Sequence, residues 1–191
     1  MNNFLKTQSD EWDRFYYFDY DERLEIFDEK ESNSEFIFSD EKRETYHLIS
    51  RQHKGDENGK TICKFAKFKI PTEYKDKLVV YVGCPRYVKV KESCSNITCS
   101  SGEVIVGRTH YGDENGYTVY QIAEVYAAVN KTIRRCMTVD TCYKEFKESI
   151  GIEAHMGGRC IVGRSHYGDE NGTTTYTFGK IVVPLKDSEI K

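Results

Sequence analysis

This sequence lacks the features that mark several large classes of protein. Its 191 residues carry 28 basic and 31 acidic side chains, a net charge of −3, so no basic surface for nucleic acid is indicated. No apolar run approaches the roughly 20 residues that a membrane-spanning helix needs. The first residues, Met-Asn-Asn-Phe-Leu-Lys-Thr, contain no apolar segment typical of a secretory signal. We therefore expect no nucleic-acid partner, no membrane span and no signal peptide.

Signatures of catalysis are also missing. The chain has no Gly-x-Ser-x-Gly turn for a nucleophilic serine, no glycine-rich phosphate loop and no His-Glu-x-x-His pattern. The spacings of Cys94 to Cys99 and of Cys136 to Cys142 are wider than the Cys-x-x-Cys of common zinc sites. We therefore expect a protein that is not an enzyme, with no cofactor and no zinc.

What the sequence has instead is one stretch written three times. The pattern Arg-x-His-x-Gly-Asp-Glu-Asn-Gly-x-Thr occupies residues 51–61, 108–118 and 164–174. The arginines are 57 residues apart (108 minus 51) and then 56 apart (164 minus 108). Repetition at this period indicates an architecture of stacked or symmetric units.

Each copy has the local pattern of a β-hairpin. Alternating apolar residues such as Val104 and Val106 precede the second copy, and Tyr117-Thr-Val-Tyr follows its turn. Asn-Gly tolerates the positive φ that tight turns require, and Asp can bond nearby backbone amides. Residues 143–150 fit either a strand or a short helix.

The sequence predicts a single all-β domain over residues 1–191. Three internal repeats of about 56 residues, near 13–70, 72–129 and 130–185, would supply about four strands each. Residues 1–12 are expected to be a polar lead-in. A pseudo-threefold β-trefoil or β-prism fits this plan, and a β-sandwich is the alternative.

The repeated polar residues have two interpretations. In the structural one, an Arg–Asp pair or the turn amides hold each hairpin closed, with Arg and His on one face of the strand. In the ligand interpretation, Asp and Asn bond sugar hydroxyls, and three shallow sites gain affinity by multivalency. The candidate ligand-binding residues are Arg51, His53, Asp56, Asn58, Arg108, His110, Asp113, Asn115, Tyr120, Arg164, His166, Asp169, Asn171 and Tyr176.

Two resemblances favour the ligand interpretation. The run from Glu103 to Asp113, Glu-Val-Ile-Val-Gly-Arg-Thr-His-Tyr-Gly-Asp, and its counterpart at 161–169 are similar to the opening of DM-nine repeats. Those repeats occur in mannose-binding lectins and natterin-like toxins. Asp113-x-Asn115 followed by Tyr120 resembles the mannose-binding pattern of monocot β-prism lectins. Both resemblances imply carbohydrate recognition.

We therefore predict a lectin-like protein that binds a glycan or glycoprotein at up to three Gly-Asp-Glu-Asn-Gly hairpins. Calcium is the alternative ligand of the same oxygen atoms. The first copy carries Lys54 and Cys63 where the others carry tyrosine, so we expect its site to be the weakest. The alternative function is a self-assembling structural or toxin-associated repeat protein, in which the motif is only a turn.

Cysteine and charge are both unevenly distributed. Six of the seven cysteines follow residue 83. We predict at least one disulfide and an extracellular or otherwise oxidising environment, with buried free thiols as the alternative. Residues 1–48 have a net charge of −8 (6 minus 14) and the remainder +5 (22 minus 17), so we expect charge complementarity between them or an acidic face for a partner. The disulfide is expected within one of two groups: Cys84, Cys94 and Cys99, or Cys136, Cys142 and Cys160.

Overall fold

The computed structural model describes residues 14–38, 45–56, 58–113, 115–169, 171–186 and 189. These residues form fifteen strands and one short 3-10 helix, η1 (Thr72–Tyr74), which confirms the all-β prediction. No helix within these ranges has the length and apolar character needed to cross a membrane. The expected lead-in at 1–12 and the motif residues Glu57, Glu114 and Glu170 lie outside the described residues.

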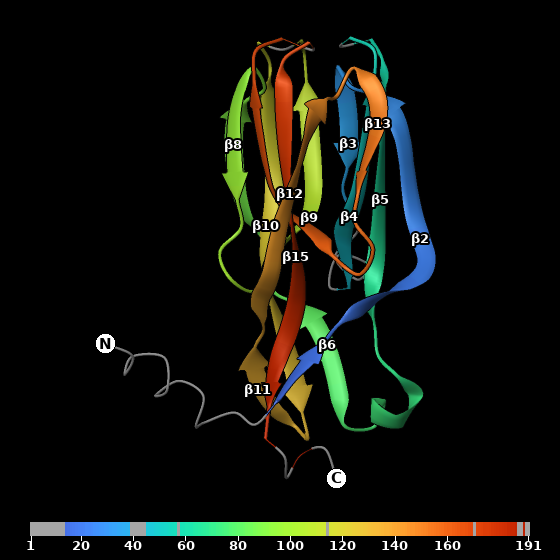
Figure 1. Cartoon of the computed structure of the whole chain (residues 1–191), viewed down its shortest axis with the longest axis vertical. Coiled ribbons are helices and arrows are strands. Elements are labelled where there is room, and N and C mark those ends of the chain that lie inside the picture. The colour runs from blue at the N-terminus through green and yellow to red at the C-terminus, as the bar shows by residue number, and fades with distance from the viewer. Residues whose placement is uncertain are drawn as a thin grey trace, which may run out of the picture.

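Twelve of the strands make three antiparallel groups of four, with their axes along the length of the molecule (Figure 1). The first group has the order β13 (Ile150–His155), β4 (Tyr46–Lys54), β5 (Lys60–Lys69), β2 (Asp19–Lys30). The second has β3 (Asn33–Phe36), β9 (Glu103–Tyr111), β10 (Tyr117–Val129), β7 (Arg86–Lys91). The third has β8 (Cys94–Thr98), β14 (Cys160–Tyr167), β15 (Thr173–Leu185), β12 (Met137–Lys147).

Each group of four contains one strand that comes from another repeat. The motif hairpins are β4–β5, β9–β10 and β14–β15, and in each the second strand pairs with a strand of its own repeat: β2, β7 or β12. The first strand of each hairpin pairs with a strand from a different repeat. β9 of the second repeat pairs with β3 of the first, β14 of the third with β8 of the second, and β4 of the first with β13 of the third. The repeats therefore interlock rather than folding as separate units.

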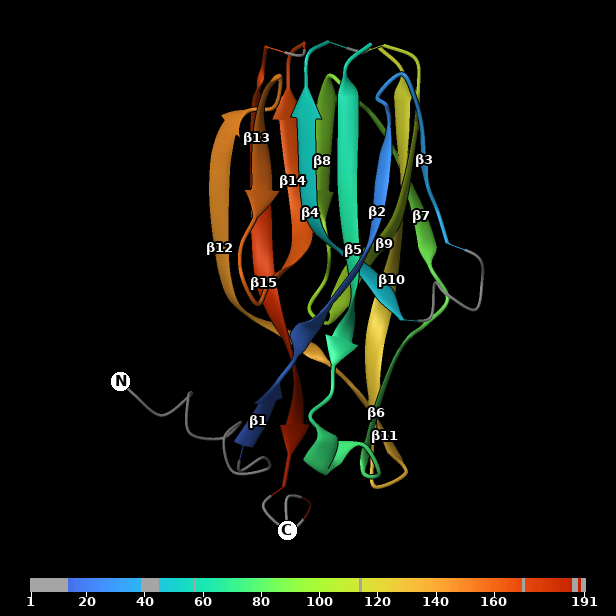
Figure 2. The same ribbon diagram turned by 90° about the vertical axis from the view of Figure 1, so that its right-hand side faces the viewer.

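The two ends of the molecule differ. The three motif turns gather at one end, at the top of Figures 1 and 2. Toward the other end, β6 (Leu78–Val82) and β11 (Thr132–Arg135) flank β10, and β1 (Arg14–Tyr17) pairs with the last residues of β15. Residues 143–150, which fitted either strand or helix, form the end of β12, a turn and the start of β13.

Side chains from all three groups fill the interior. One apolar cluster centres on Phe36, Phe65 and Phe178, and a second on Val104, Val125 and Val183. The acidic N-terminal part packs on the rest of the chain partly through charge: Asp28 on β2 lies 3.2 Å from the Nζ of Lys60 on β5. Charge complementarity is thus confirmed at this contact.

All seven cysteines are free, so the predicted disulfide is not formed. Cys63, Cys136 and Cys160 are buried and serve as small apolar residues of the core. Cys84 and Cys94 are exposed. The clustering in sequence was misleading because the cysteines of one group lie on different elements: Cys94 begins β8, whereas Cys142 is on β12 and Cys160 begins β14.

Candidate functional site

The three motif arginines meet inside the protein in a closed ring with three glutamates. Arg51 pairs with Glu31 at 3.0 Å and also with Glu148. Arg164 pairs with Glu148 at 2.7 Å and with Glu92 at 2.6 Å. Arg108 completes the ring with Glu92 at 3.6 Å and with Glu31. Every charge thus contacts two of opposite sign, and the ring as a whole is neutral.

The ring is buried, which makes its pairing obligatory. The arginine side chains are at most 2% exposed and those of the glutamates at most 9%. Burial by itself would raise the pKa of each carboxyl group. Arg108 and Arg51 nevertheless hold the pKa of Glu31 well below its usual value, and Arg164 and Arg108 lower the pKa of Glu92 to about 2. All three glutamates are therefore ionised at neutral pH, since the pKa of Glu148 is lowered by Arg164 and Arg51 in the same way.

These glutamates were missed by the sequence analysis, although they have a signal of their own. Each lies in a Lys-Glu-Ser sequence, at 30–32, 91–93 and 147–149. The spacings are 61 residues (92 minus 31) and 56 residues (148 minus 92), close to the period of the main motif. The three turns at these positions join β2 to β3, β7 to β8 and β12 to β13. A search for a second repeat at the same period would have found them.

The histidines connect the ring to the turns. His110 Nδ1 lies 2.8 Å from the hydroxyl oxygen of Thr118, which in turn donates to Glu92. Nε2 of the same ring lies 3.1 Å from the carbonyl oxygen of Gly112 in the turn. His53 repeats this pattern with Thr61, Glu31 and Gly55. His166 Nδ1 lies 2.6 Å from the hydroxyl oxygen of Thr174, and its Nε2 lies 3.0 Å from the carbonyl oxygen of Asp169. Burial and then the neighbouring arginine lower the pKa of all three imidazoles.

The later tyrosines of the motif are buried against the arginines. Tyr176 is 1% exposed, donates to Glu148 and accepts a hydrogen bond of 2.8 Å from Arg51. Tyr120 is also 1% exposed and lies 3.4 Å from Nη1 of Arg164. In the first copy the same position is Cys63, which is fully buried and makes that corner of the ring apolar.

The aspartates close the turns instead of pairing with the arginines. Oδ1 of Asp113 accepts a 2.8 Å hydrogen bond from the backbone N–H of Asn115, and Asp56 and Asp169 accept the same bond at 2.9 Å. The predicted Arg–Asp pair is therefore not formed, whereas the predicted contact with turn amides is. Asn-Gly tolerates positive φ, but in this turn the positive φ occurs at the first glycine, 102° at Gly112, and not at Asn115.

The second glycine of the turn is required for a different reason. A Cβ on Gly116 would lie 2.2 Å from the carbonyl oxygen of Tyr111, and the equivalent contacts at Gly59 and Gly172 are 2.1 Å. The motif turns are also hydrogen-bonded to the Lys-Glu-Ser turns through the backbone. The N–H of Gly112 donates to the carbonyl oxygen of Ser32, that of Gly168 to Ser93, and that of Gly55 to Ser149. Backbone hydrogen bonds therefore join the motif turns to the Lys-Glu-Ser turns at this end of the molecule.

We call the exposed surface of these turns the turn end. It carries the Asp-x-Asn pairs of the three turns, all of them exposed. The rings of Tyr111, Tyr117 and Tyr167 beside them are 54%, 54% and 58% exposed. The first copy has Lys54 and Lys60 at the positions of Tyr111 and Tyr117. The members of the turn end are Asp56, Asn58, Asp113, Asn115, Asp169, Asn171, Tyr111, Tyr117 and Tyr167.

The predicted site residues thus divide into two groups. The aspartates and asparagines are exposed at the turn end, where a ligand can reach them. The arginines, histidines, Tyr120 and Tyr176 are buried, so the direct ligand contact predicted for them does not fit their position. Within the described ranges, no three His, Cys, Asp or Glu side chains converge as a metal site requires. Comparison with family models, curated proteins and solved structures finds no match to this chain.

Proposed function

We propose that this protein is a lectin that binds glycans at the turn end. The observation that carries the proposal is the gathering of three exposed Asp-x-Asn turns and three exposed tyrosines at one end of the molecule. Carboxylate and amide groups can bond pairs of sugar hydroxyls, and aromatic rings pack on the apolar face of a sugar. Three weak sites held at fixed separations would gain affinity for a branched or clustered glycan.

The buried ring supports this function indirectly. Because the arginines, histidines and glutamates tie the turns to the interior, the turns need no ordering when a ligand binds. We propose further that the chain is a pseudo-threefold repeat of the β-prism kind. The recurrence of the same strand pairings in three four-stranded groups around one interior supports that assignment.

The test is a glycan array with competition by free sugar, comparing the native protein with a triple variant, Asp56→Asn, Asp113→Asn and Asp169→Asn. Asparagine keeps the Oδ1 acceptor of the turn, so the melting temperature should stay nearly unchanged. Loss of the charge should weaken each sugar contact, since hydrogen bonds to charged groups contribute about 1.5–3 kcal/mol. Asp76→Asn, at an exposed position outside the motif, is the matched control. Undiminished glycan binding by the triple variant would refute the proposal.

Self-association is a second candidate, favoured by an apolar row on the opposite end. Val79 of β6 and Ile133 of β11 both lie in register with Ala128 of β10, and they are 56% and 63% exposed. Tyr81 and Tyr126, in the neighbouring row, stack at 5.7 Å. Exposed apolar strands of this kind are sites of pairing between chains. Analytical ultracentrifugation of the native protein and of Val79→Lys tests this role. If the protein self-associates through this row, the mass of the assembly in solution should fall on substitution.

A further inference from the structure

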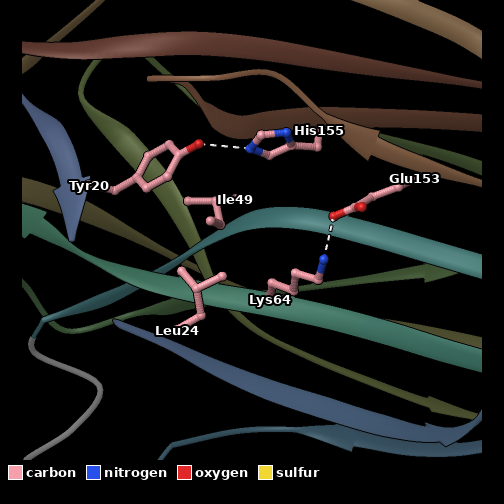
Figure 3. Close-up of a pocket in the computed structure, with 6 residues that line it drawn as sticks. All are labelled: Tyr20, Leu24, Ile49, Lys64, Glu153 and His155. Atoms are coloured by element: carbon pink, nitrogen blue, oxygen red, sulfur yellow. Dashed lines mark hydrogen bonds and ion pairs between the residues drawn. The ribbon is translucent and has the colours of Figure 1, made fainter. Parts of the chain in front are cut away.

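A hollow of about 360 Å³ lies on the side of the molecule, where β13 of the third repeat meets β4 and β5 of the first (Figure 3). Its lining comes from four strands and none of its residues belongs to the turn end. It is lined by Tyr20, Leu24, Ile49, Lys64, Glu153 and His155. The volume is within the range of small-molecule sites and is large enough for one six-membered ring with its substituents.

Two hydrogen-bonded pairs face each other across an aliphatic floor in this hollow. On one side, the Tyr20 hydroxyl lies 2.7 Å from Nε2 of His155. On the other, Nζ of Lys64 lies 2.8 Å from Oε1 of Glu153. Ile49, which is 1% exposed, lies between the pairs, as Figure 3 shows. Glu153 and His155 are two residues apart on β13 and therefore point to the same side of the strand.

The charged pair is held in place but remains accessible. Ser50, which is buried, donates a 2.5 Å hydrogen bond to Glu153. The Lys64 and Glu153 side chains are 28% and 36% exposed. Hydrogen bonds from Lys64 and Ser50 outweigh the effect of burial and lower the pKa of Glu153, so it stays ionised. The hollow thus offers an anionic acceptor at Glu153, a cationic donor at Lys64, and the hydroxyl and imidazole of the Tyr20–His155 pair.

The chain contains this constellation once, unlike the motif. Lys64 lies 13 residues after Arg51, and the residues 13 after Arg108 and Arg164 are Gln121 and Thr177. Glu153 pairs with Gln52, next to Arg51, and at the same register β3 has Glu35 and β8 has Asn96. The acid therefore recurs on β3, but the lysine that pairs with it does not. A ligand in this hollow would therefore bind with one site per chain.

We propose that this hollow is a binding site for a single neutral, polyhydroxylated six-membered ring, such as a monosaccharide. The charges of Lys64 and Glu153 cancel, so an anion would be attracted by one and repelled by the other, and so would a cation. A neutral ring with neighbouring hydroxyls can donate to Glu153 and accept from Lys64 at the same time. Its apolar face would rest on Ile49 and Leu24, with a further hydroxyl at the Tyr20–His155 pair. This site does not depend on the proposed lectin function of the turn end.

The test titrates the full chain with mannose, galactose, glucose, N-acetylglucosamine and fucose, and follows its amide nuclear magnetic resonance signals. Glucuronate and glucosamine serve as the anionic and cationic probes. At least one neutral sugar should shift the signals of Lys64, Glu153 and His155 with a stoichiometry of one per chain, and both charged probes should bind more weakly. No shift at these residues with any neutral sugar, or tighter binding of glucuronate, would overturn the proposal.

Two variants separate this site from the turn end. Lys64→Gln should weaken sugar binding at the hollow by roughly tenfold or more, because it replaces a charged donor. Leu24→Phe should abolish binding by filling the hollow, and it leaves the charged pair intact. Lys69→Gln, an exposed lysine on the same strand, is the matched control and should change nothing. The triple aspartate variant should keep this binding, so each site can fail without the other. Equal binding by Lys64→Gln and Lys69→Gln would count against the proposal.

Discussion

Glu31, in the turn after β2, and Arg108, on β9, form a buried ion pair although 77 residues separate them. Glu31 also binds Arg51 of its own repeat. One carboxylate thus connects the first repeat to the second, and the ring repeats this connection around the interior. The cross-repeat strand pairs and the ion pairs therefore both join segments that carry different copies of the motif.

Removing one charge from the ring should be costly. We predict that Arg108→Met lowers the free energy of unfolding by about 3–5 kcal/mol, because Glu31 would remain buried without that partner. Arg135→Met should cost less than about 1 kcal/mol, since Arg135 and Glu124 form a surface pair with side chains 50% and 37% exposed. Urea unfolding at neutral pH measures both. Equal effects of the two substitutions would show that the ring contributes no more than a surface pair.

The second glycine of the motif should tolerate no side chain. Gly116→Ala places a Cβ against the carbonyl oxygen of Tyr111, so the backbone must shift, and we predict a loss of about 1–3 kcal/mol. Gly157→Ala is the control, because a Cβ there meets nothing within 4 Å, and it should stay within about 0.5 kcal/mol of the native protein. Thermal melting of the two variants decides the matter, and an unchanged melting temperature for Gly116→Ala would contradict the turn geometry.

Thiol titration should find seven free cysteines in the denatured, unreduced protein. In the native protein, only exposed thiols such as Cys84 and Cys94 should react quickly with a thiol reagent. Burial raises the pKa of Cys63 and of Cys136 to about 12, so little reactive thiolate forms at either. A count below seven after denaturation would show that a disulfide exists after all.

Acid should destabilise the protein, in part through His47. This side chain stacks on Phe68 at 4.0 Å, its Nδ1 has no partner among the described residues, and burial lowers its pKa to about 3. A group whose pKa is lowered in the folded state contributes stability that is fully present at pH values above its unfolded-state pKa, which is about 6.5 for histidine. This stability is lost as the pH falls toward the folded-state pKa. Between about pH 6.5 and pH 4.5 the loss from His47 should be about 2–3 kcal/mol.

The variant His47→Leu isolates this contribution. Leucine keeps the apolar packing without a titrating group, so unfolding free energies measured in urea at the two pH values should differ less than in the native protein. The remaining slope would come from the three motif histidines and, at lower pH, from the ring glutamates, whose pKa values are shifted in the same direction. An identical pH dependence in native protein and variant would show that His47 does not titrate on unfolding.

The sequence by itself determined the strands and the turns. Alternating apolar residues around Val104 and Val106 predict a strand, and Gly-Asp-x-Asn-Gly predicts a hairpin turn closed by the aspartate on its own amides. These are local interactions between residues a few positions apart, so a single sequence is enough to reveal them. Arg108 and His110 likewise share a face because of the strand period alone.

Tertiary structure decided which face was buried and what the polar residues contact. Arg108 could be assigned to a ligand because its partner Glu31 lies 77 residues away, and no local pattern specifies such a pairing. The free cysteines follow from the same cause, since bonding requires side chains to converge in space and not in sequence. The hollow beside β13 and β4 forms because a strand of the third repeat pairs with a strand of the first. Such pairing between distant segments depends on long-range packing, which the periodicity of the sequence does not encode.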